Sequence, residues 1–314
     1  MQRGTTMSKP WVVVLAGGEG TRLHSLTRAL YGVDLPKQFA VLVGERSLLQ
    51  LTVERAELLT TRDRILVVVT AHREALTRQQ LAPYGGVTIL AQPRSLDTGP
   101  GMLFPLAYIL GVDPLATVAF LPSDHYIPNA DPLLDALRAP TAERVALIGV
   151  APTAPEMEYG WIVPGRRLRA SARREVTRFV EKPAAHVAES LFVGGALWNT
   201  FIQIGALTTY WDLVRGHLPG HARAFERFAT AVGSLGESFA LAEAYDQVER
   251  ANFSSDVLAH ATELAVAPVS GSGWNDWGSP RRVFESLAGT SHLETLLSRI
   301  RGPRSMVEEL RAAS

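Results

Sequence analysis

The chain has 314 residues, 46% of them apolar, which is enough for a large buried core in one big domain or one domain with an appendage. Lys plus Arg and Asp plus Glu both number 31, so the formal net charge is zero. Such a chain lacks the overall field that attracts nucleic acid or an anionic membrane. The absence of cysteine excludes disulfides, thiolate metal sites and cysteine nucleophiles, and it fits a cytoplasmic protein.

The chain opens with a polar stretch, residues 1–10, which we expect to be a flexible tail. The apolar run after it, residues 11–16, is far too short to be a signal segment or to cross a membrane, which takes about 20 residues. The glycines that follow, Gly17 and Gly18, predict instead a buried strand that runs into a tight turn.

Short apolar runs rich in β-branched residues alternate with longer helical patterns in the first half of the chain. The predicted strands are residues 11–16, 65–70, 87–91, 117–121 and 145–150, and the predicted helices are 47–59, 72–82, 99–110 and 131–139. Because these runs are apolar throughout, they fit a sheet covered on both faces. The alternation predicts parallel βαβ units in a three-layer α/β fold, in which ligands gather beyond the carboxyl ends of the strands.

The pattern changes after residue 150. The second half predicts a hairpin, a long helical stretch broken at Leu218-Pro219-Gly220, a last strand and a terminal helix, at residues 159–164 with 175–180, 206–247, 263–268 and 292–301. We find no repeat and no long linker. We therefore expect a catalytic domain over residues 11–285, whose irregular second half builds a substrate wall, and a C-terminal helical extension over residues 286–314.

The first predicted strand leads into Ala16-Gly17-Gly18-Glu19-Gly20-Thr21-Arg22-Leu23. Three glycines let backbone N–H groups approach phosphate oxygens, and a helix beginning near His24 adds its positive N-terminal end. Arg22 adds a full charge. The spacing matches neither a Walker A loop nor a GxGxxG fingerprint, which disfavours a nicotinamide dehydrogenase. A tight strand-to-helix turn without a ligand remains an open alternative for this segment alone.

The segment Pro36-Lys37-Gln38-Phe39 follows the loop, so Lys37 could reach the same phosphates. Together, the two segments resemble those of the sugar-phosphate nucleotidyltransferases, above all the mannose-1-phosphate guanylyltransferase branch. Further segments continue the resemblance in order, from about residue 11 to 279: Leu121-Pro122-Ser123-Asp124-His125, Tyr159-Gly160-Trp161-Ile162, Phe179-Val180-Glu181-Lys182-Pro183, Trp198-Asn199 and Trp274-Asn275-Asp276-Trp277-Gly278.

The resemblance implies a Rossmann-like, GT-A-like fold with a mixed, mostly parallel central sheet. It implies that the chain transfers a nucleotidyl group from a nucleoside triphosphate, GTP in the first place, to a sugar 1-phosphate, mannose 1-phosphate in the first place, and releases pyrophosphate. The expected partners are then these two substrates, with no nucleic acid and no membrane. Whether the chain forms a homo-oligomer is left open. The chain ends soon after the last motif, so we expect no added β-helical or cupin-type domain.

Asp124 follows a predicted buried strand and Asp276 lies in a Trp/Gly-rich turn, and two such carboxylates in one cleft suit Mg²⁺. A helix cap is the alternative for Asp124, which follows a strand, in isolation. The resemblance makes Asp124 and Asp276 the metal ligands. It implies catalytic roles for Arg22, Lys37, Lys182 and Asp124, nucleotide contacts for Ala16, Gly17, Gly18, Gly20, Thr21, Gln92, Thr98 and Gly99, and sugar contacts for Gly160, Glu181 and Asn199.

Two positions depart from the family pattern. The chain has Leu96-Asp97-Thr98-Gly99-Pro100 where the guanylyltransferase branch usually has Arg-Asn-Thr-Ala-Pro, and Asp97 would repel a triphosphate unless a metal or an arginine offsets it. Phe201 stands where a glycine is usual, and its bulk would narrow the sugar pocket. The base therefore stays open, with thymidylyl and uridylyl transfer as alternatives. A non-catalytic protein that binds nucleotide sugars also remains an alternative. Such a protein would be expected to lack the metal-binding and phosphate-binding groups, but this chain has all five of them: Arg22, Lys37, Asp124, Lys182 and Asp276.

Overall fold

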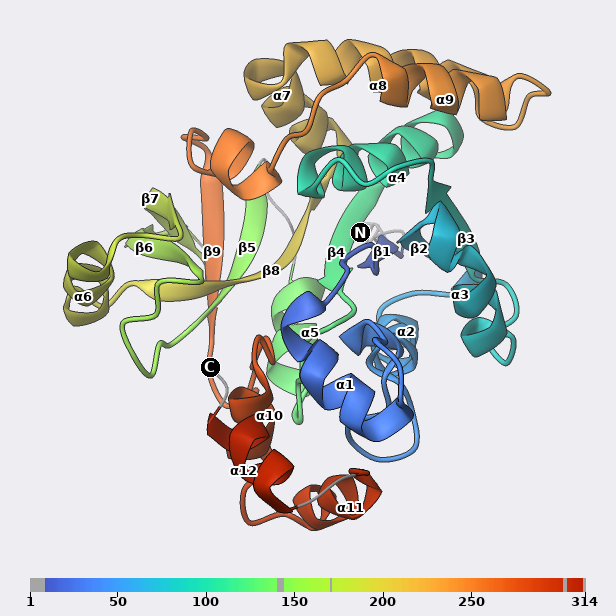
Figure 1. Cartoon of the computed structure of the whole chain (residues 1–314). Helices are drawn as coiled ribbons and strands as arrows, with labels where there is room; N and C mark the ends of the chain where they lie inside the picture. The colour runs from blue at the N-terminus through green and yellow to red at the C-terminus, as the bar shows by residue number, and fades with distance from the viewer. Residues whose placement is uncertain (1–8, 140–143, 170, 302–303, 313–314) are drawn as a thin grey trace, which may run out of the picture.

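A nine-stranded mixed sheet forms the centre of the part of the chain that the computed structural model describes, which is residues 9–139, 144–169, 171–301 and 304–312 (Figure 1). The expected flexible tail, residues 1–10, lies outside these residues except for Lys9 and Pro10. The strands are β1 (Trp11–Leu15), β2 (Ile65–Thr70), β3 (Thr88–Gln92), β4 (Thr117–Pro122), β5 (Val145–Val150), β6 (Gly160–Arg167), β7 (Arg174–Glu181), β8 (Leu197–Ala206) and β9 (Leu264–Val269).

The strands lie in the order β3-β2-β1-β4-β8-β5-β9-β7-β6. The first four are parallel to one another, and β8 is antiparallel to both β4 and β5. In the described part of the chain, all strands except β7 and β8 therefore run in one direction, so the sheet is mixed, as expected. A further antiparallel pairing of β6 with β8 closes the second half of the sheet on itself.

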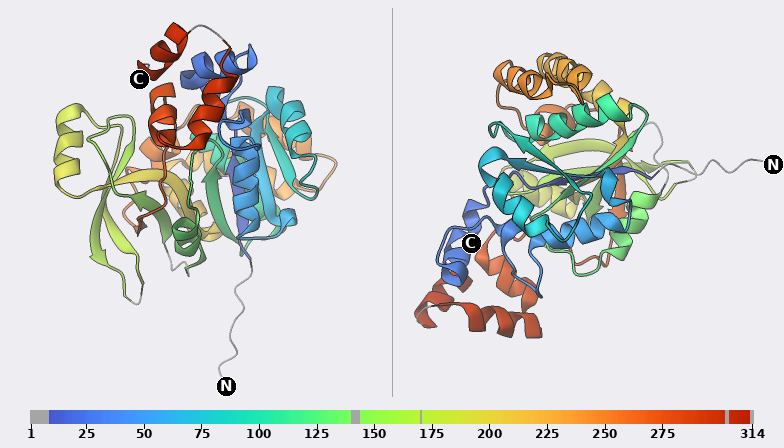
Figure 2. Two further views of the ribbon diagram at one scale, coloured as in Figure 1. Left: turned by 90° about the horizontal axis from the view of Figure 1, so that it is seen from below. Right: turned by 90° about the vertical axis from the view of Figure 1, so that its right-hand side faces the viewer.

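Helices cover both faces of the sheet (Figure 2). The helices of the described residues are α1 (His24–Tyr31), α2 (Leu48–Glu57), α3 (Glu74–Leu81), α4 (Thr98–Val112), α5 (Asp131–Arg138), α6 (Ala185–Val193), α7 (Leu207–His217), α8 (Pro219–Ala231), α9 (Glu237–Asp246), α10 (Pro280–Leu287), α11 (Ser291–Arg299) and α12 (Arg304–Ala312). In the described ranges, every helix falls short of the length or the hydropathy that crossing a bilayer requires.

The apolar runs predicted as strands are buried on both sides. Val13 and Leu66 belong to the core between the sheet and helices α4 and α7 to α9. Val12 and Val67 belong to the core on the other face, between the sheet and helices α2, α3 and α5. Alternate side chains of one strand therefore enter opposite cores, which is why these strands lack the polar alternation of a half-exposed strand.

The second half matches the predicted hairpin, the broken helical stretch and the last strand, with Pro219 as the first residue of α8. Sequence reasoning missed α6, β8 and α10. The missed strand β8 lies in the middle of the sheet, but Asn199, Thr200 and Gln203 interrupt its apolar pattern. Thr200 is buried and its hydroxyl donates to the carbonyl of Ile148, so the polar side chain is satisfied inside the core.

The three C-terminal helices pack against α1. Leu26 and Leu30 of α1 share a core cluster with Phe284 of α10, Leu296 of α11 and Leu310 of α12. This cluster anchors the segment just before α10, which carries Asp276, next to the helix that follows the glycine-rich loop.

Candidate active site

The glycine-rich segment after β1 forms a loop that turns sharply towards α1. Gly20 has a φ of 60°, and a Cβ there would lie 2.9 Å from the backbone nitrogen of Lys37, so the position requires glycine. The side-chain nitrogen of Gln38 donates to the carbonyls of Ala16 (3.0 Å) and Gly18 (2.6 Å). These bonds hold the loop in one conformation.

The expected nucleotide-binding residues of this loop divide into three groups. Gly17 and Gly18 line a pocket of about 470 Å³, a volume typical of small-ligand sites. Gly20 and Thr21 line a smaller pocket of about 180 Å³, and Asp124 borders both pockets. Ala16 is buried and its N–H donates to β2, so its backbone groups already have protein partners.

Lys37 joins the two predicted metal ligands. Its Nζ lies 3.0 Å from Oδ2 of Asp124 and donates to the backbone carbonyl of Asp276 at 2.5 Å. The segments that carry the aspartates lie side by side, because Tyr126 and Asn275 exchange two backbone hydrogen bonds, of 2.9 and 3.0 Å. Residues from the first half of the chain, near the glycine-rich loop, and from the C-terminal half thus meet at one point.

The carboxylate of Asp276 is firmly oriented. Its Oδ1 accepts hydrogen bonds from the hydroxyl of Tyr159 (2.6 Å), the N–H of Gly278 (2.9 Å) and the guanidinium of Arg282 (2.9 Å). Its Oδ2 faces the guanidinium of Arg22, which is half exposed and lies 3.5 Å away. One oxygen is therefore committed to the protein, and the other points towards the glycine-rich loop.

Both carboxyl groups are held in the charged form. Burial acts to raise the pKa of Asp124 and of Asp276, but the nearby positive charge of Lys37 and the other donors outweigh it, so both pKa values lie below the usual range. Burial lowers the pKa of His125. The Nδ1 of this histidine accepts a hydrogen bond from the indole N–H of Trp274 at 3.1 Å, which requires the neutral ring.

The donor set suits a hard divalent cation that is held partly by its substrate. No described residues form a group of three or more His, Cys, Asp or Glu side chains able to hold a metal by themselves. Oδ1 of Asp124 lies 3.6 Å from the neutral ring of His125, and Oδ2 of Asp276 lies 3.5 Å from the guanidinium of Arg22, so neither oxygen makes a short hydrogen bond to these neighbours. Mg²⁺ is commonly bound in this way, by one or two carboxylates together with substrate phosphates and water.

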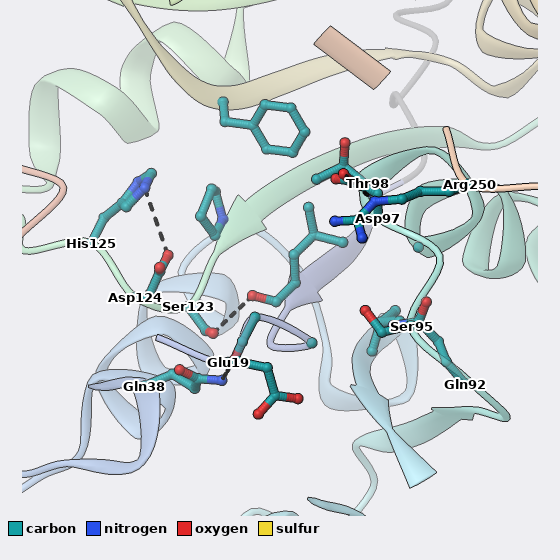
Figure 3. Close-up of a pocket in the computed structure, with 17 residues that line it drawn as sticks. Glu19, Gln38, Gln92, Ser95, Asp97, Thr98, Ser123, Asp124, His125 and Arg250 are labelled. Atoms are coloured by element: carbon teal, nitrogen blue, oxygen red, sulfur yellow. Dashed lines mark hydrogen bonds and ion pairs between the residues drawn. The ribbon is translucent and has the colours of Figure 1, made fainter. Parts of the chain in front are cut away.

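The larger pocket extends from Asp124 to the end of β3 (Figure 3). Gln92, Ser95 and Thr98 lie on the side opposite Asp124 in that view. The predicted nucleotide contacts Gln92 and Thr98 therefore line the pocket. Gly99 stands back from it, because its N–H donates to the carbonyl of Ala251 (2.8 Å) and a Cβ there would lie 2.7 Å from the same oxygen.

An arginine offsets the unexpected acidic residue at this end. Asp97 adopts a φ of 71° and caps α4 through its side chain, which accepts from the N–H of Thr98 at 2.7 Å. The guanidinium of Arg250, which also lines the pocket, donates to Asp97 Oδ2 at 3.2 Å. Asn252 donates to the other oxygen at 3.2 Å. The repulsion expected between Asp97 and a triphosphate is therefore countered by Arg250.

The three predicted sugar-binding residues cluster at the joined ends of β6, β7 and β8. Gly160 is paired with Glu181, and a Cβ on Gly160 would lie 2.7 Å from Glu181 Oε2 and 3.3 Å from the Cβ of Asn199. Burial raises the pKa of Glu181. Lys182 follows with a φ of 44°, and Phe201 adopts a φ of 59°, the left-handed region that glycine favours. Phe201 lines the larger pocket, so it narrows the space beside this cluster.

Sequence reasoning missed four residues of the site: Gln38, Tyr245, Arg250 and Arg282. Gln38 lies beside Lys37 in the motif, and Arg282 follows the Asp276 motif by a few residues, so closeness to a motif was an available signal. Tyr245, whose hydroxyl donates to Gln92, and Arg250 lie in a segment without any motif, so only the fold brings them to the site.

The family model described as nucleotidyl transferase matches residues 11–291. The chain is 34% identical over 284 residues to the xanthan biosynthesis protein XanB of Xanthomonas campestris pv. campestris strain B100, a match that covers 87% of this chain and 58% of that protein. It is 31% identical over 302 residues to the mannose-1-phosphate guanylyltransferase of Escherichia coli K12, covering 90% of this chain and 61% of that protein. The chain thus spans about three fifths of the length of these two relatives.

The fold is also similar to a solved structure. The crystal structure of mannose-1-phosphate geranyltransferase from Thermus thermophilus matches with a TM-score of 0.76 and 30% sequence identity, over 89% of this chain and 79% of that one. The family model covers most of the chain, including the loop, both aspartates and the sugar cluster. The chain therefore belongs to the nucleotidyl transferase family.

Proposed function

We propose that this protein transfers a nucleotidyl group from GTP to mannose 1-phosphate, with Mg²⁺, and releases pyrophosphate. The observation that carries the proposal is the meeting of Asp124, Asp276 and Lys37 beside the glycine-rich loop. The name of the Escherichia coli relative supports this choice of base and sugar. Arg250 pairs with Asp97 and so offsets the negative charge that would repel a triphosphate at this end of the pocket.

In the proposed reaction, the phosphate oxygen of the sugar 1-phosphate attacks the α-phosphorus, and the bond to the pyrophosphate breaks. The nucleophile is already an anion, so the protein supplies orientation and positive charge instead of a covalent nucleophile. Lys37 binds the phosphates near the reacting centre, Arg22 binds the leaving pyrophosphate and Lys182 binds the sugar phosphate. Gly17 and Gly18 admit the nucleotide close to the loop backbone, and Glu181 and Asn199 bind sugar hydroxyls.

Asp124 and Asp276 are the residues that would hold Mg²⁺, which when bound neutralises charge on the phosphates. Arg282 and Tyr159 keep the Asp276 carboxylate in place through its Oδ1. We further propose that the fold is of the three-layer, Rossmann-like, GT-A-like type, with the catalytic domain over residues 11–285 and the helical extension over residues 286–314. The mixed sheet with helices on both faces supports this assignment.

The test is a panel of GTP, ATP, UTP and dTTP against mannose 1-phosphate and glucose 1-phosphate, with Mg²⁺ and with EDTA, in which released pyrophosphate is measured. We expect the fastest release with GTP and mannose 1-phosphate and none in EDTA. A faster reaction with another pair would correct the substrates and keep the reaction class. Tight binding of GDP-mannose without release from any pair would identify a non-catalytic binding protein and end the proposal.

A further inference from the structure

Gln92 is the last residue of β3, and its side chain lines the larger pocket on the side opposite Asp124 (Figure 3). The residue is only 5% exposed, so its side chain has few available orientations. A glutamine amide carries a carbonyl acceptor at one end and an N–H donor at the other. Which end meets a bound ligand therefore decides which ligand atoms the residue can recognise.

Tyr245 holds the acceptor end. Its hydroxyl donates to Oε1 of Gln92 at 3.1 Å, the nearer of two acceptors, since the carbonyl of Pro100 lies 3.5 Å away. The Tyr245 side chain, on α9, is 1% exposed. The rings of Phe104 and Phe225 pack edge-on against Tyr245, with centroids 6.2 and 5.5 Å away, so the hydroxyl has a fixed position. Burial raises the pKa of Tyr245, and the hydroxyl therefore keeps the proton that it donates.

The first turn of α4 favours the same orientation. Oε1 of Gln92 lies 3.4 Å from the point where a Cβ on Gly101 would be, next to this turn. The N-terminal turn of a helix carries partial positive charge, which attracts a carbonyl oxygen and repels an N–H group. The helix and Tyr245 therefore both act to keep the oxygen of Gln92 directed towards α4 and α9, which leaves the N–H end on the side of the glycine-rich loop.

The donor end is left for a ligand. Nε2 of Gln92 lies 2.8 Å from the point where a Cβ on Gly17 would be, against the glycine-rich loop that lines the pocket. Within the described part of the chain, this nitrogen has no hydrogen-bond partner. A residue larger than glycine at position 17 would displace it.

We propose that Tyr245 is a positioning residue that presents the N–H of Gln92 to the nucleobase, so that the site favours bases with a carbonyl oxygen at that point over bases with an amino group. Guanine, uracil and thymine present such an oxygen, whereas adenine and cytosine present an amino group. A donor facing an amino group leaves both without a partner, and a site built to form one hydrogen bond rejects the analogue that lacks it. The inference rests on the proposed function in one respect, that this pocket takes the nucleotide.

The experiment compares Tyr245→Phe with Tyr210→Phe. Tyr210 is equally buried in the same core cluster, but its hydroxyl has no partner among the described residues, so its removal controls for the loss of a buried hydroxyl. Affinities for GTP and ATP are measured by calorimetry without sugar phosphate, and kinetic constants by pyrophosphate release. We expect Tyr245→Phe to lower the preference for GTP over ATP about tenfold, the effect of one hydrogen bond, by raising the KM for GTP. Its kcat and its KM for the sugar phosphate stay unchanged.

A second variant reverses the chemistry. In Gln92→Glu, one carboxylate oxygen still accepts from Tyr245 and the other meets the base as an acceptor, so the preference should shift towards ATP. An unchanged GTP-to-ATP ratio in Tyr245→Phe, or an equal loss in Tyr210→Phe, would overturn the proposal. Because calorimetry does not need turnover, wild-type protein that binds GTP but reacts with no sugar phosphate would refute only the proposed reaction.

Discussion

The ammonium group of Lys37 lies 3.0 Å from the carboxylate of Asp124. The same ammonium group donates to the backbone carbonyl of Asp276, so one side chain holds together two acidic segments that are far apart in the chain. Only 7% of the Lys37 side chain is exposed, and this positive charge is what keeps the Asp124 carboxylate ionised against the effect of burial.

Replacing Lys37 by Met should reduce the rate of pyrophosphate release by about 10²–10³-fold, the usual effect of losing one preorganised charge contact. The variant should also be less stable by about 1–3 kcal/mol, because Asp124 loses its counter-charge in a partly buried place. Steady-state assays and urea unfolding measure the two effects. Lys37→Arg should not restore activity, since the guanidinium is larger and differently shaped. Near-normal activity in Lys37→Met would contradict the assigned role.

Replacing either aspartate by asparagine should abolish activity, but the two variants should differ in stability. Asp124→Asn and Asp276→Asn should both lose turnover, because each removes a carboxylate expected to hold Mg²⁺. Asp124→Asn should cost only about 1 kcal/mol, since its side chain is a third exposed and the asparagine oxygen can still accept from the buried ammonium of Lys37. Asp276→Asn should cost about 2–3 kcal/mol, because its Oδ1 accepts three hydrogen bonds, one of them from Arg282.

Thermal melts and pyrophosphate release distinguish the two variants. Equal stability losses would show that the hydrogen bonds to Asp276 matter less than their geometry indicates.

Glu181→Gln should be more stable than the wild type at neutral pH. Burial raises the pKa of Glu181 above its ordinary value of 4.5, so the folded state binds this proton more tightly than the unfolded chain does. The stability that this proton contributes is complete below the ordinary pKa and is lost as the pH rises through the folded-state pKa. At about pH 7 the wild type carries the full cost of the buried charge, which glutamine avoids.

Urea unfolding of both proteins across the acid range checks this sign. The advantage of Glu181→Gln should shrink as the pH falls towards the ordinary pKa of glutamate. Glu189→Gln, which removes one exposed negative charge on α6, is the matched control. A difference that stays constant with pH would mean that the Glu181 carboxyl is not perturbed by its surroundings.

Asp97 and Arg250 should have opposite effects on nucleotide binding. Asp97→Asn keeps the shape of the side chain and the helix cap, but it removes a negative charge from the pocket, so the KM for the triphosphate should fall several-fold. Arg250→Ala leaves Asp97 without its ion pair, so the same KM should rise. Neither change should alter stability by more than about 1 kcal/mol, since the Arg250 side chain is largely exposed.

Substrate saturation curves at low and high salt test both variants. The shifts in KM should shrink at high ionic strength, because salt screens exposed charges. If both variants raised the KM, Asp97 would be acting through structure and not through its charge.

Local patterns were enough to predict the first half of the fold. Strands β1 to β5 are continuous apolar runs because both faces of the sheet are covered, and the helices between them follow their own periodicity. The central strand β8 escaped prediction because Asn199, Thr200 and Gln203 break its apolar run. Thr200 finds a partner in the carbonyl of Ile148 and Asn199 lies in the sugar cluster, whereas the buried Oε1 of Gln203 has no hydrogen-bond partner among the described residues. A local pattern does not contain the neighbours that decide this.

The amino-acid sequence by itself determined the α/β class, the glycine-rich loop and the order of the motifs that carry Lys37, Asp124 and Asp276. Only the tertiary structure decided that these motifs meet at one ammonium group, that Gly99 turns away from the pocket, and that Tyr245 and Arg250 join the site. The reason is physical. Periodicity and turn chemistry act between residues close in the chain, whereas these hydrogen bonds and ion pairs join residues that only the packing of strands and helices brings together.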